Sequence, residues 1–574
     1  MQKPRIRGFF IYRPMNVPGS NVARHLRQAA LEQPEAVATL SPLSVGPDAK
    51  VVHARCSFRR LDQESDAAAR IFQAEGIALG TRTLLAVRPG HDLIVAMFGL
   101  LKLGAVPVAI DPGMGVRSFL RCVRHTEPEA LVGARAAVWL SRTPLPAFRS
   151  LRARVQVGTT KWRLLREQCA SAEPRPLAEV SPDSPAAILF TSGSTGAPKG
   201  VDYTHGMFDA QIELIRRTYA IQPGEVDMPM LPLFALFNPA LRMTTVTPLL
   251  DPSRPAAADP APIVAALRSE QVTNSFGSPA VWGRLADHCE RRGLSLPSLR
   301  RVLIAGAPVP DGLLAQLRRI APQAQVHTPY GATECLPVST ITAAELLAHH
   351  VAAARQGHGT CVGRAVNGVE IRVIREVNGP LRTLAETTAC APGEVGEIIA
   401  TGPSVTRAYH RLPEATAAAK IADGDRVWHR MGDLGALGAD GLLRFLGRRA
   451  ERVRTASGDL PTEAVEPAFR AHPDVARCAL IGLGMQAPFV PALVVEPREG
   501  RFPADARERE QFIAKLRACA EGNPAATRVD TFLFQAKLPV DVRHNAKIHR
   551  LQLAKAWTER LRADRLNPLR RLFR

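Results

Sequence analysis

The chain has 574 residues, of which 46% are hydrophobic and 5% aromatic, and its formal net charge is +21. A chain of this length exceeds a single hydrophobic core, so we expect at least two domains, and the composition excludes a disordered or fibrous protein. With few aromatic side chains to stack on bases and no nucleic-acid-binding motif, we interpret the positive charge as spread over solvated faces and expect no nucleic acid partner.

Helical and strand patterns alternate along the chain, which is typical of stacked α/β layers. A charged segment with a shorter α+β pattern follows Gly447. We therefore predict a large, multilayered N-terminal α/β domain at 1–447 and a smaller, mobile C-terminal α+β domain at 448–574. The predicted elements, in chain order, are a helix at 58–75, a strand at 83–87, a helix at 93–103, strands at 106–110 and 188–190, a loop at 251–262, a strand at 302–304, a helix with a loop at 342–358, and a strand at 397–399.

The termini and the cysteines bear on location. Residues 3–13 are basic around a short apolar run, and 560–574 form a basic amphipathic stretch; either end could lie on a membrane surface or bind a partner. The N-terminal run is too short for a signal peptide, and the most apolar window, 93–101, is too short to span a membrane. The nine cysteines include no C-x-x-C pair. We predict a cytoplasmic protein with reduced thiols that is not an integral membrane protein.

The strongest local signal is a glycine- and hydroxyl-rich turn directly after the strand at 188–190. Glycine lets the backbone approach an anion closely, and hydroxyls with a lysine add donors for phosphate oxygens. Pro198 excludes the Walker A pattern. The segment therefore predicts a phosphate-binding loop whose residues are Thr191, Ser192, Gly193, Ser194, Thr195, Gly196, Ala197, Pro198, Lys199 and Gly200.

Further short motifs follow this loop in a fixed order, and together the chain resembles the superfamily of adenylate-forming enzymes over roughly residues 20–555. These motifs are Gly306-Ala307-Pro308, Tyr330-Gly331-Ala332-Thr333-Glu334, Met431-Gly432-Asp433, Gly447-Arg448 and Lys547. The resemblance implies that ATP and Mg²⁺ are used to join a carboxylate to AMP. A carboxylate that attacks the α-phosphate of ATP meets a polyanion, so cations that neutralise the phosphate charge favour the reaction.

The resemblance also implies a role for each residue. Catalysis would fall to Lys547, Glu334 and Thr333, with Thr333 near the α-phosphate. Glu334 and Thr191 would bind Mg²⁺, and Asp433 with Arg448 would bind the ribose. Tyr330 would lie against adenine, with Gly306, Ala307, Pro308, Gly331 and Ala332 also at the nucleotide.

The segment after the phosphate loop bears on the second half-reaction. Its run from Leu231 to Leu241, with Ala235 where acyl-CoA synthetases commonly carry His, is similar to that of the β-lactone synthetases of bacterial long-chain olefin biosynthesis. This similarity implies a long-chain 2-alkyl-3-hydroxy fatty acid whose own β-hydroxyl closes the lactone, and association with other enzymes of that pathway. His205 is our candidate base. The alternatives are a long-chain acyl-CoA or acyl-carrier-protein ligase, in which Ser457 could obstruct a thiol tunnel, and a non-catalytic scaffold.

Overall fold

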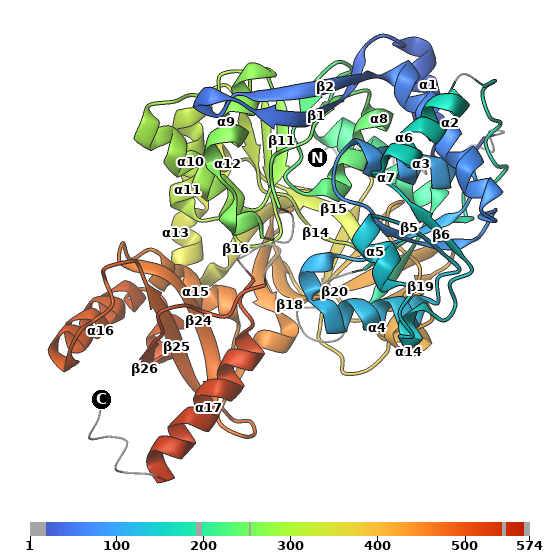
Figure 1. The fold of residues 1–574 in the computed structure, drawn as a ribbon. Coiled ribbons are helices and arrows are strands. Elements are labelled where there is room, and N and C mark those ends of the chain that lie inside the picture. Colours follow the sequence, from blue (N-terminus) through green and yellow to red (C-terminus); the bar gives the residue numbers. More distant parts are fainter. Residues whose placement is uncertain (1–18, 171, 191–197, 252–253, 542–546, 567–574) are drawn as a thin grey trace, which may run out of the picture.

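A computed structural model describes residues 19–170, 172–190, 198–251, 254–541 and 547–566. Figure 1 shows a large part built from three sheets and their helices, and a smaller part at one side that ends in the red helix α17 (Arg550–Leu566). The predicted fold class, a large α/β domain followed by a smaller α+β domain, is confirmed. The boundary after residue 447 stays a prediction.

The first sheet lies between two layers of helices. Its strands are parallel except for the last pair. Leu131 packs in one core with α4 and α5, whereas Ala130 and Val132 face the core of α2 and α3, because successive strand residues point to opposite faces. The strand order is β6 (Ala153–Gln156), β5 (Ala130–Gly133), β3 (Arg82–Ala86), β4 (Val106–Ala109), β7 (Pro185–Phe190) and β8 (Gly200–Thr204). The helices are α1 (Arg24–Glu32), α2 (Phe58–Ala74), α3 (His91–Lys102), α4 (Val116–Thr126), α5 (Arg135–Leu140), α6 (Thr160–Ala170) and α7 (His205–Thr218).

Two more sheets complete the large part. The second is parallel apart from the β1–β2 pair, and the third is antiparallel. The second contains β13 (Gln325–His327), β12 (Arg301–Ile304), β11 (Asn274–Gly277), β9 (Val226–Asp227), β10 (Thr244–Val246), β1 (Val37–Val45) and β2 (Val51–Ser57). The third contains β14 (Tyr330–Ala332), β15 (Cys335–Thr340), β16 (Thr360–Ala365), β21 (Leu443–Arg448), β20 (Arg426–Leu437), β18 (Gly396–Thr401) and β17 (Glu370–Ile374), with β19 (Lys420–Asp423) beside β20. Their helices are α8 (Asn238–Leu241), α9 (Pro260–Ser269), α10 (Pro279–Arg292), α11 (Asp311–Ile320), α12 (Ala343–His349), α13 (Val351–Ala353) and α14 (Pro413–Ala419).

The C-terminal domain packs helices on both faces of a small sheet. Along β24, Leu480 packs in a core with α15 and α16, whereas Ile481 packs in another with α17. Thr360 Oγ1 donates a hydrogen bond of 2.7 Å to Glu463 Oε2 and joins this domain to the third sheet. The elements are β22 (Val453–Thr455), β23 (Gly458–Leu460), α15 (Thr462–Arg470), β24 (Val475–Leu483), β25 (Val490–Pro497), α16 (Ala506–Ala520), β26 (Thr531–Phe534) and α17.

Most of the predicted elements are confirmed. The helices at 58–75 and 93–103 are α2 and α3, and the strands at 83–87, 106–110, 188–190, 302–304 and 397–399 are β3, β4, β7, β12 and β18. The predicted helix with a loop at 342–358 is α12, α13 and a π-helical turn at 354–358. The loop at 251–262 was predicted too long, because α9 begins at Pro260. Asp259 Oδ1 accepts the Ala261 N–H at 3.0 Å, and a proline at the first helical position suits a helix start.

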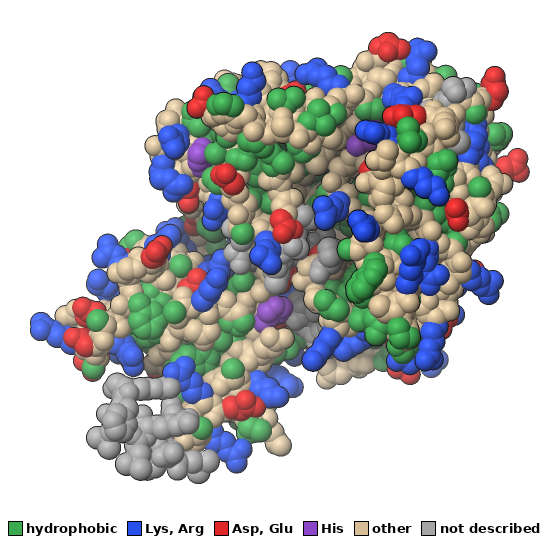
Figure 2. Space-filling model, viewed as in Figure 1, with side chains coloured by type: hydrophobic (Ala, Val, Ile, Leu, Met, Phe, Trp, Pro, Cys, Tyr) green, Lys and Arg blue, Asp and Glu red, His purple; other side chains and the backbone are tan. Residues whose placement is uncertain are grey.

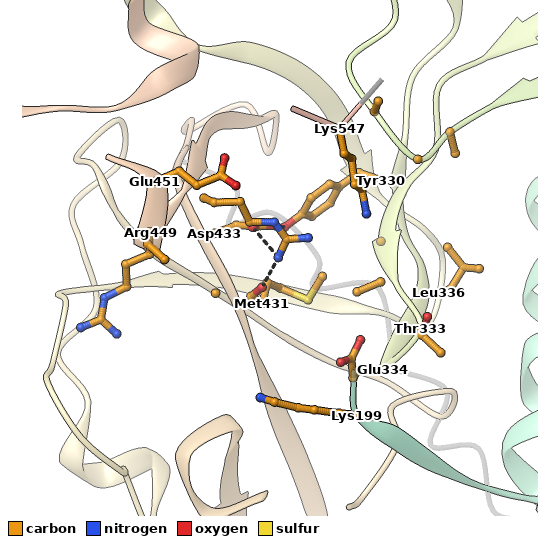
Figure 3. A pocket seen from close by; sticks show the side chains of 18 of the residues that line it. Lys199, Tyr330, Thr333, Glu334, Leu336, Met431, Asp433, Arg449, Glu451 and Lys547 are labelled. Atoms are coloured by element: carbon orange, nitrogen blue, oxygen red, sulfur yellow. Dashed lines mark hydrogen bonds and ion pairs between the residues drawn. The ribbon is translucent and has the colours of Figure 1, made fainter. Parts of the chain in front are cut away.

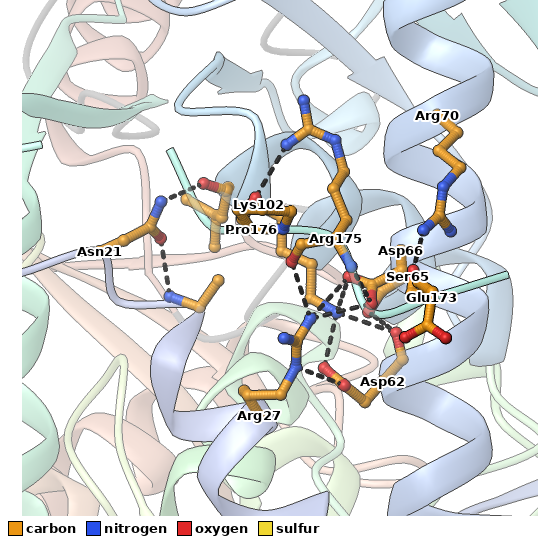
Figure 4. Close-up of polar contacts among 12 residues, drawn as sticks. Asn21, Arg27, Asp62, Ser65, Asp66, Arg70, Lys102, Glu173, Arg175 and Pro176 are labelled. Carbon is orange, nitrogen blue, oxygen red and sulfur yellow. Dashed lines mark hydrogen bonds and ion pairs between the residues drawn. The ribbon is translucent and has the colours of Figure 1, made fainter. Parts of the chain in front are cut away.

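A buried ionic cluster ties the first three helices together (Figure 4). Lys102 on α3 is 0% exposed, and its ammonium lies 2.6 Å from Asp62 Oδ1 and 2.7 Å from Asp66 Oδ1, both on α2. Arg27 on α1 pairs with the same two carboxylates at 2.6 and 2.8 Å. The backbone N–H of Arg175 donates to Asp66 Oδ2 at 3.1 Å, which attaches the segment before β7.

On the face drawn in Figure 2 the positive charge is dispersed. Figure 2 shows Lys and Arg side chains scattered over the whole of the drawn face, with acidic side chains between them. No helix among the described residues is long and apolar enough to cross a membrane. The basic N-terminal segment at 3–13, and residues 567–574 of the basic C-terminal stretch, lie outside the described residues.

Candidate active site

A single cavity of about 1710 Å³ is lined by both domains and collects most of the residues that the sequence motifs single out. They come from the loops after β7 and β12, from β14 and the turn after it, from β20 and β21, and from the segment before α17. The chain therefore brings together side chains that are hundreds of positions apart in sequence. Those lining the cavity are Lys199, Gly306, Ala307, Pro308, Tyr330, Gly331, Ala332, Thr333, Glu334, Asp433, Arg448 and Lys547.

Of the predicted phosphate loop at 191–200, the structure describes only residues 198–200. Thr191, Ser192, Gly193, Ser194, Thr195 and Gly196 lie outside the described residues. Phe190, at the end of β7, and Lys199, just before β8, both line the cavity. Lys199 places its ammonium 4.7 Å from the centre of the Tyr409 ring, a cation–π contact that holds the side chain at the cavity wall.

A buried acidic group lies at the centre of the cavity lining. Asp433 on β20 is 3% exposed, and its Oδ1 lies 3.1 Å from Nη1 of Arg448, which faces it from β21. Tyr330 Oη donates a hydrogen bond of 2.6 Å to Asp433 Oδ2. Burial raises the pKa of Asp433, while Arg448, Tyr330 and Lys547 act in the opposite direction. Asp433 Oδ1 is buried and, apart from this ion pair with Arg448, accepts no hydrogen bond from the described residues.

Glu334 is held by a separate set of contacts. It is 8% exposed, and Tyr409 Oη donates a hydrogen bond of 2.7 Å to its Oε1. Its backbone carbonyl accepts the Thr406 N–H at 2.9 Å and the Thr406 hydroxyl at 3.2 Å. Lys420 Nζ donates to that same hydroxyl at 3.1 Å. The carboxylate is therefore fixed in direction, at a wall where a divalent cation could meet it.

Lys547 reaches the cavity from the C-terminal domain. Figure 3 shows its side chain extending past Tyr330 into the space that Glu334 and Lys199 border from the other side. Its backbone carbonyl accepts the Asp541 N–H at 2.8 Å, which anchors the segment ahead of α17. Two lysines from distant parts of the chain thus border one space with Glu334, as an anionic ligand would require.

The rest of the cavity is apolar. One region of its lining comes from the segment before α1, from α3 and from α7, and belongs to the core beneath the first sheet; it contains Val22, Met97, Phe98, Leu101, Phe208 and Ile212. Another comes from the segment 231–240 with β11, and contains Leu233, Phe234, Leu236, Phe237, Ala240 and Phe276. A ligand with a polar head at Asp433 and Glu334 could therefore bury a long hydrocarbon part here.

The structure gives no support to His205 as a base. The residue is the first of α7, is 0% exposed and does not line the cavity. Its Nδ1 accepts the Val22 N–H at 3.1 Å, and burial lowers the pKa of the imidazole to about 4. We interpret His205 as a packing residue that joins α7 to the segment before α1.

Two residues that bear on the second half-reaction also lie away from the cavity lining. Ala235 packs into the core of the first sheet, so its small size does not enlarge the cavity directly. Ser457 is exposed in the turn between β22 and β23, where its Oγ accepts Arg528 Nη2 at 2.9 Å. In this arrangement of the two domains, in which Lys547 lines the cavity, the turn between β22 and β23 does not line it.

Sequence reasoning missed several residues that shape the site. Tyr409 and Thr406 follow β18 in an irregular segment and hold Glu334, which precedes Tyr409 by 75 positions. Tyr203 donates its hydroxyl to the backbone carbonyl of Thr333. The signal in the sequence is weak: Tyr203 is an aromatic residue within a strand and Tyr409 an isolated one after a strand, and both are equally typical of ordinary core packing.

Comparison with known proteins agrees with this geometry. A family profile described as "AMP-binding enzyme" matches residues 26–410. An olefin beta-lactone synthetase of Stenotrophomonas maltophilia is 43% identical over 552 residues, which cover 94% of this chain and 98% of that protein. An olefin beta-lactone synthetase of Xanthomonas campestris pv. campestris is 42% identical over 548 residues, covering 93% and 97% of the two chains.

Solved structures share the fold at lower identity. The O-succinylbenzoate coenzyme A synthetase of Bacillus subtilis, in complex with AMP, matches with a TM-score of 0.72 at 20% identity, covering 92% of this chain and 97% of that one. ATP-bound MatB from Rhodopseudomonas palustris matches with a TM-score of 0.75 at 19% identity, covering 94% and 99%.

Proposed function

The chain belongs to the family of AMP-binding enzymes, and from this premise we propose that it is an ATP-dependent ligase that converts a long-chain 2-alkyl-3-hydroxy fatty acid into a β-lactone in olefin biosynthesis. The observation that carries the proposal is the 43% identity to an olefin beta-lactone synthetase across 94% of this chain. The combination of charged site and apolar lining in one cavity of about 1710 Å³ supports it.

The first step is adenylation. A carboxylate oxygen attacks the α-phosphorus of ATP, and the bond to the bridging oxygen breaks so that pyrophosphate leaves. We assign Lys547 and Lys199 to the charge of the reacting phosphates, where preorganised cations lower the barrier most effectively. Asp433 and Arg448 bind the ribose, and Tyr330 with the turn at 306–308 borders the base. Thr333 lies next to Glu334 and is assigned to the α-phosphate.

Glu334 fits a magnesium ion. Mg²⁺ in phosphate-transfer sites is held by one or two carboxylates together with substrate phosphates. Glu334 supplies one carboxylate at the cavity wall, already oriented by Tyr409. The ion would neutralise charge on the triphosphate; Thr191 remains a predicted second ligand. The oxygen-rich donor set suits this hard cation.

The second step is ring closure. The β-hydroxyl oxygen attacks the acyl carbonyl carbon, the bond to the AMP phosphate breaks, and the hydroxyl loses its proton as AMP leaves. Because nucleophile and electrophile belong to one molecule, no second substrate has to be bound and oriented, and the reactive mixed anhydride offsets the strain of the four-membered ring. No thiol substrate is needed. Domain rotation is expected to gate the cycle, since Lys547 reaches the site from the C-terminal domain.

A product assay tests the proposal. The enzyme is incubated with ATP, Mg²⁺ and a 2-alkyl-3-hydroxy acid, with and without coenzyme A. We expect lactone, AMP and pyrophosphate in equal amounts in both reactions. A thioester formed only with coenzyme A would favour an acyl-CoA ligase instead. A cytoplasmic location belongs to the same proposal and is supported by free thiols at the eight cysteines whose side chains the structure describes.

A further inference from the structure

A second, smaller cavity lies against the wall of the main one. Its volume is about 60 Å³, and it is lined by α7, α8, β11 and the start of β15. The residues that line both cavities and so form the partition are Phe234, Phe237, Phe276, Pro329 and Leu336. Pro329 and Leu336 flank the segment from Tyr330 to Glu334, so the partition begins beside the charged end of the site.

Stacked aromatic rings form the core of the partition. The rings of Phe234 and Phe276 are 3.8 Å apart at 14°, and Phe237 lies 6.1 Å from Phe234. Phe234 belongs to a short 3₁₀ segment, Pro232–Leu236, not to a long helix or a central strand. A side-chain rotation of Phe234 would therefore thin the partition without moving a sheet.

The charged and amide groups around the small cavity are already paired. Asn238 Nδ2 donates to Asp227 Oδ2 at 2.9 Å, and Asn274 Nδ2 donates to Glu225 Oε2 at 2.7 Å. Arg301 Nη1 also donates to Glu225 Oε2, at 2.5 Å. The remaining lining is largely hydrocarbon, with Ile215, Ile221, Leu241, Met243 and Leu303. Tyr219 Oη, on the same lining, has no hydrogen-bond partner among the described residues. A hydrocarbon chain can enter without stranding the paired groups.

We propose that this cavity behind Phe234 and Phe276 receives the alkyl chain at C2 of a doubly alkylated acid. The inference rests on the proposed function and extends it to a second chain-binding subsite. C2 is bonded to the reacting carboxyl carbon, so a branch there leaves the charged site beside Leu336. The other chain follows the apolar lining of α3 and α7. At about 60 Å³ the cavity accepts the first carbons of the branch, and displacement of Phe234 admits longer ones.

The test uses acids of one main-chain length that carry hydrogen, methyl, butyl or decyl at C2. Ile215→Phe fills the small cavity, whereas Ile212→Phe, on the same helix, narrows the main one. For Ile215→Phe we expect the ratio of kcat/KM for the butyl acid over the unbranched acid to fall about tenfold or more. Ile212→Phe should lower both values together and leave their ratio near that of the wild type. The assignment would be overturned if the butyl-to-unbranched ratio of kcat/KM were the same in the wild type and Ile215→Phe, or if that ratio fell equally in the two variants.

A second variant guards against a folding defect. Phe234→Ala removes the partition and should raise the ratio for the decyl over the methyl acid several-fold; an unchanged ratio contradicts the proposal. Release of pyrophosphate measures adenylation, a step that an acyl-CoA ligase would also perform. The ratios can therefore be measured even when no lactone forms. Absence of lactone would reject the proposed function but not the subsite. Calorimetric binding of the same acids in the presence of AMP gives these ratios even for acids that do not react.

Discussion

The hydroxyl of Tyr409 donates a hydrogen bond of 2.7 Å to Oε1 of Glu334, across 75 positions of sequence. Burial and the neighbouring Glu334 carboxylate raise the pKa of Tyr409, so the phenol stays protonated and remains a donor over the whole working pH range. The same ring accepts the ammonium of Lys199 on its face. One aromatic side chain thus orients both the carboxylate and a cation of the site.

Tyr409→Phe should weaken the use of Mg²⁺. The variant keeps the ring beneath Lys199 and removes only the hydrogen bond to Glu334. A hydrogen bond to a charged group contributes about 1.5–3 kcal/mol, so we expect the Mg²⁺ concentration for half-maximal adenylation to rise by roughly 10- to 100-fold. Pyrophosphate release against Mg²⁺ concentration measures this, and calorimetry of ATP binding with and without Mg²⁺ checks it independently of turnover.

Two comparisons make this result specific. Tyr409→Leu also removes the ring beneath Lys199 and should raise the KM for ATP in addition. If Tyr409→Phe shows the Mg²⁺ dependence of the wild type, the hydrogen bond does not orient a metal ligand.

Lys547→Ala should slow adenylation strongly while the protein still binds AMP. Loss of one preorganised donor to developing charge typically costs about 10²- to 10³-fold in kcat. Single-turnover pyrophosphate release measures the loss, and the AMP-induced shift in melting temperature reports binding. Lys537→Ala, an exposed lysine outside the cavity lining, is the matched control. Turnover unchanged in Lys547→Ala would favour a non-catalytic protein.

Two parts of the site could be predicted because their motifs directly follow a strand. The turn at 306–308 follows β12, and the phosphate loop follows β7, so both open at carboxyl ends of parallel strands. Ligands of α/β sheets bind at such edges. The meeting of Glu334 and Lys547 does not follow from this rule; it was implied by the resemblance to the adenylate-forming enzymes.

The rest depended on packing that sequence spacing does not encode. His205 follows the phosphate loop closely, yet Thr204 caps α7, accepting the Met207 N–H at 3.3 Å, and the helix turns the imidazole into the core. The Tyr409–Glu334 bond and the partition of Phe234 with Phe276 join segments from separate sheets and loops. The 251–262 loop was predicted too long because prolines both break helices and begin them.

Asp227→Asn should stabilise the protein at neutral and basic pH but not at acidic pH. Burial raises the pKa of Asp227 from 3.8 to about 7. The folded state therefore holds a proton that the unfolded state has released between these values, so the contribution of Asp227 to stability is full below about pH 3.8 and is lost as the pH rises through 7. At pH 8 the variant should gain up to about 4 kcal/mol in the free energy of unfolding, from about three pKa units at 1.36 kcal/mol each.

Urea denaturation at pH 5, 6.5 and 8 measures the effect. The advantage of Asp227→Asn over the wild type should grow with pH across this series, since Asn can still accept the hydrogen bond from Asn238. A constant difference at all three pH values would mean that Asp227 does not titrate there in the folded state.

Lys102→Met should destabilise the large domain more than any loss of packing would explain. The methionine nearly matches the lysine in volume, but it leaves Asp62 and Asp66 with Arg27 as their remaining side-chain cation among the ion pairs of the described residues. Removing one partner of a buried ion pair costs about 3–5 kcal/mol, because an uncompensated charge stays buried. Thermal unfolding measures the loss, and Lys555→Met, whose side chain is 78% exposed, should change stability by less than about 0.5 kcal/mol. The triple variant that also carries Asp62→Asn and Asp66→Asn should recover part of the loss, since it removes the unpaired charge; without such recovery, the cost of Lys102→Met would be one of shape and not of charge.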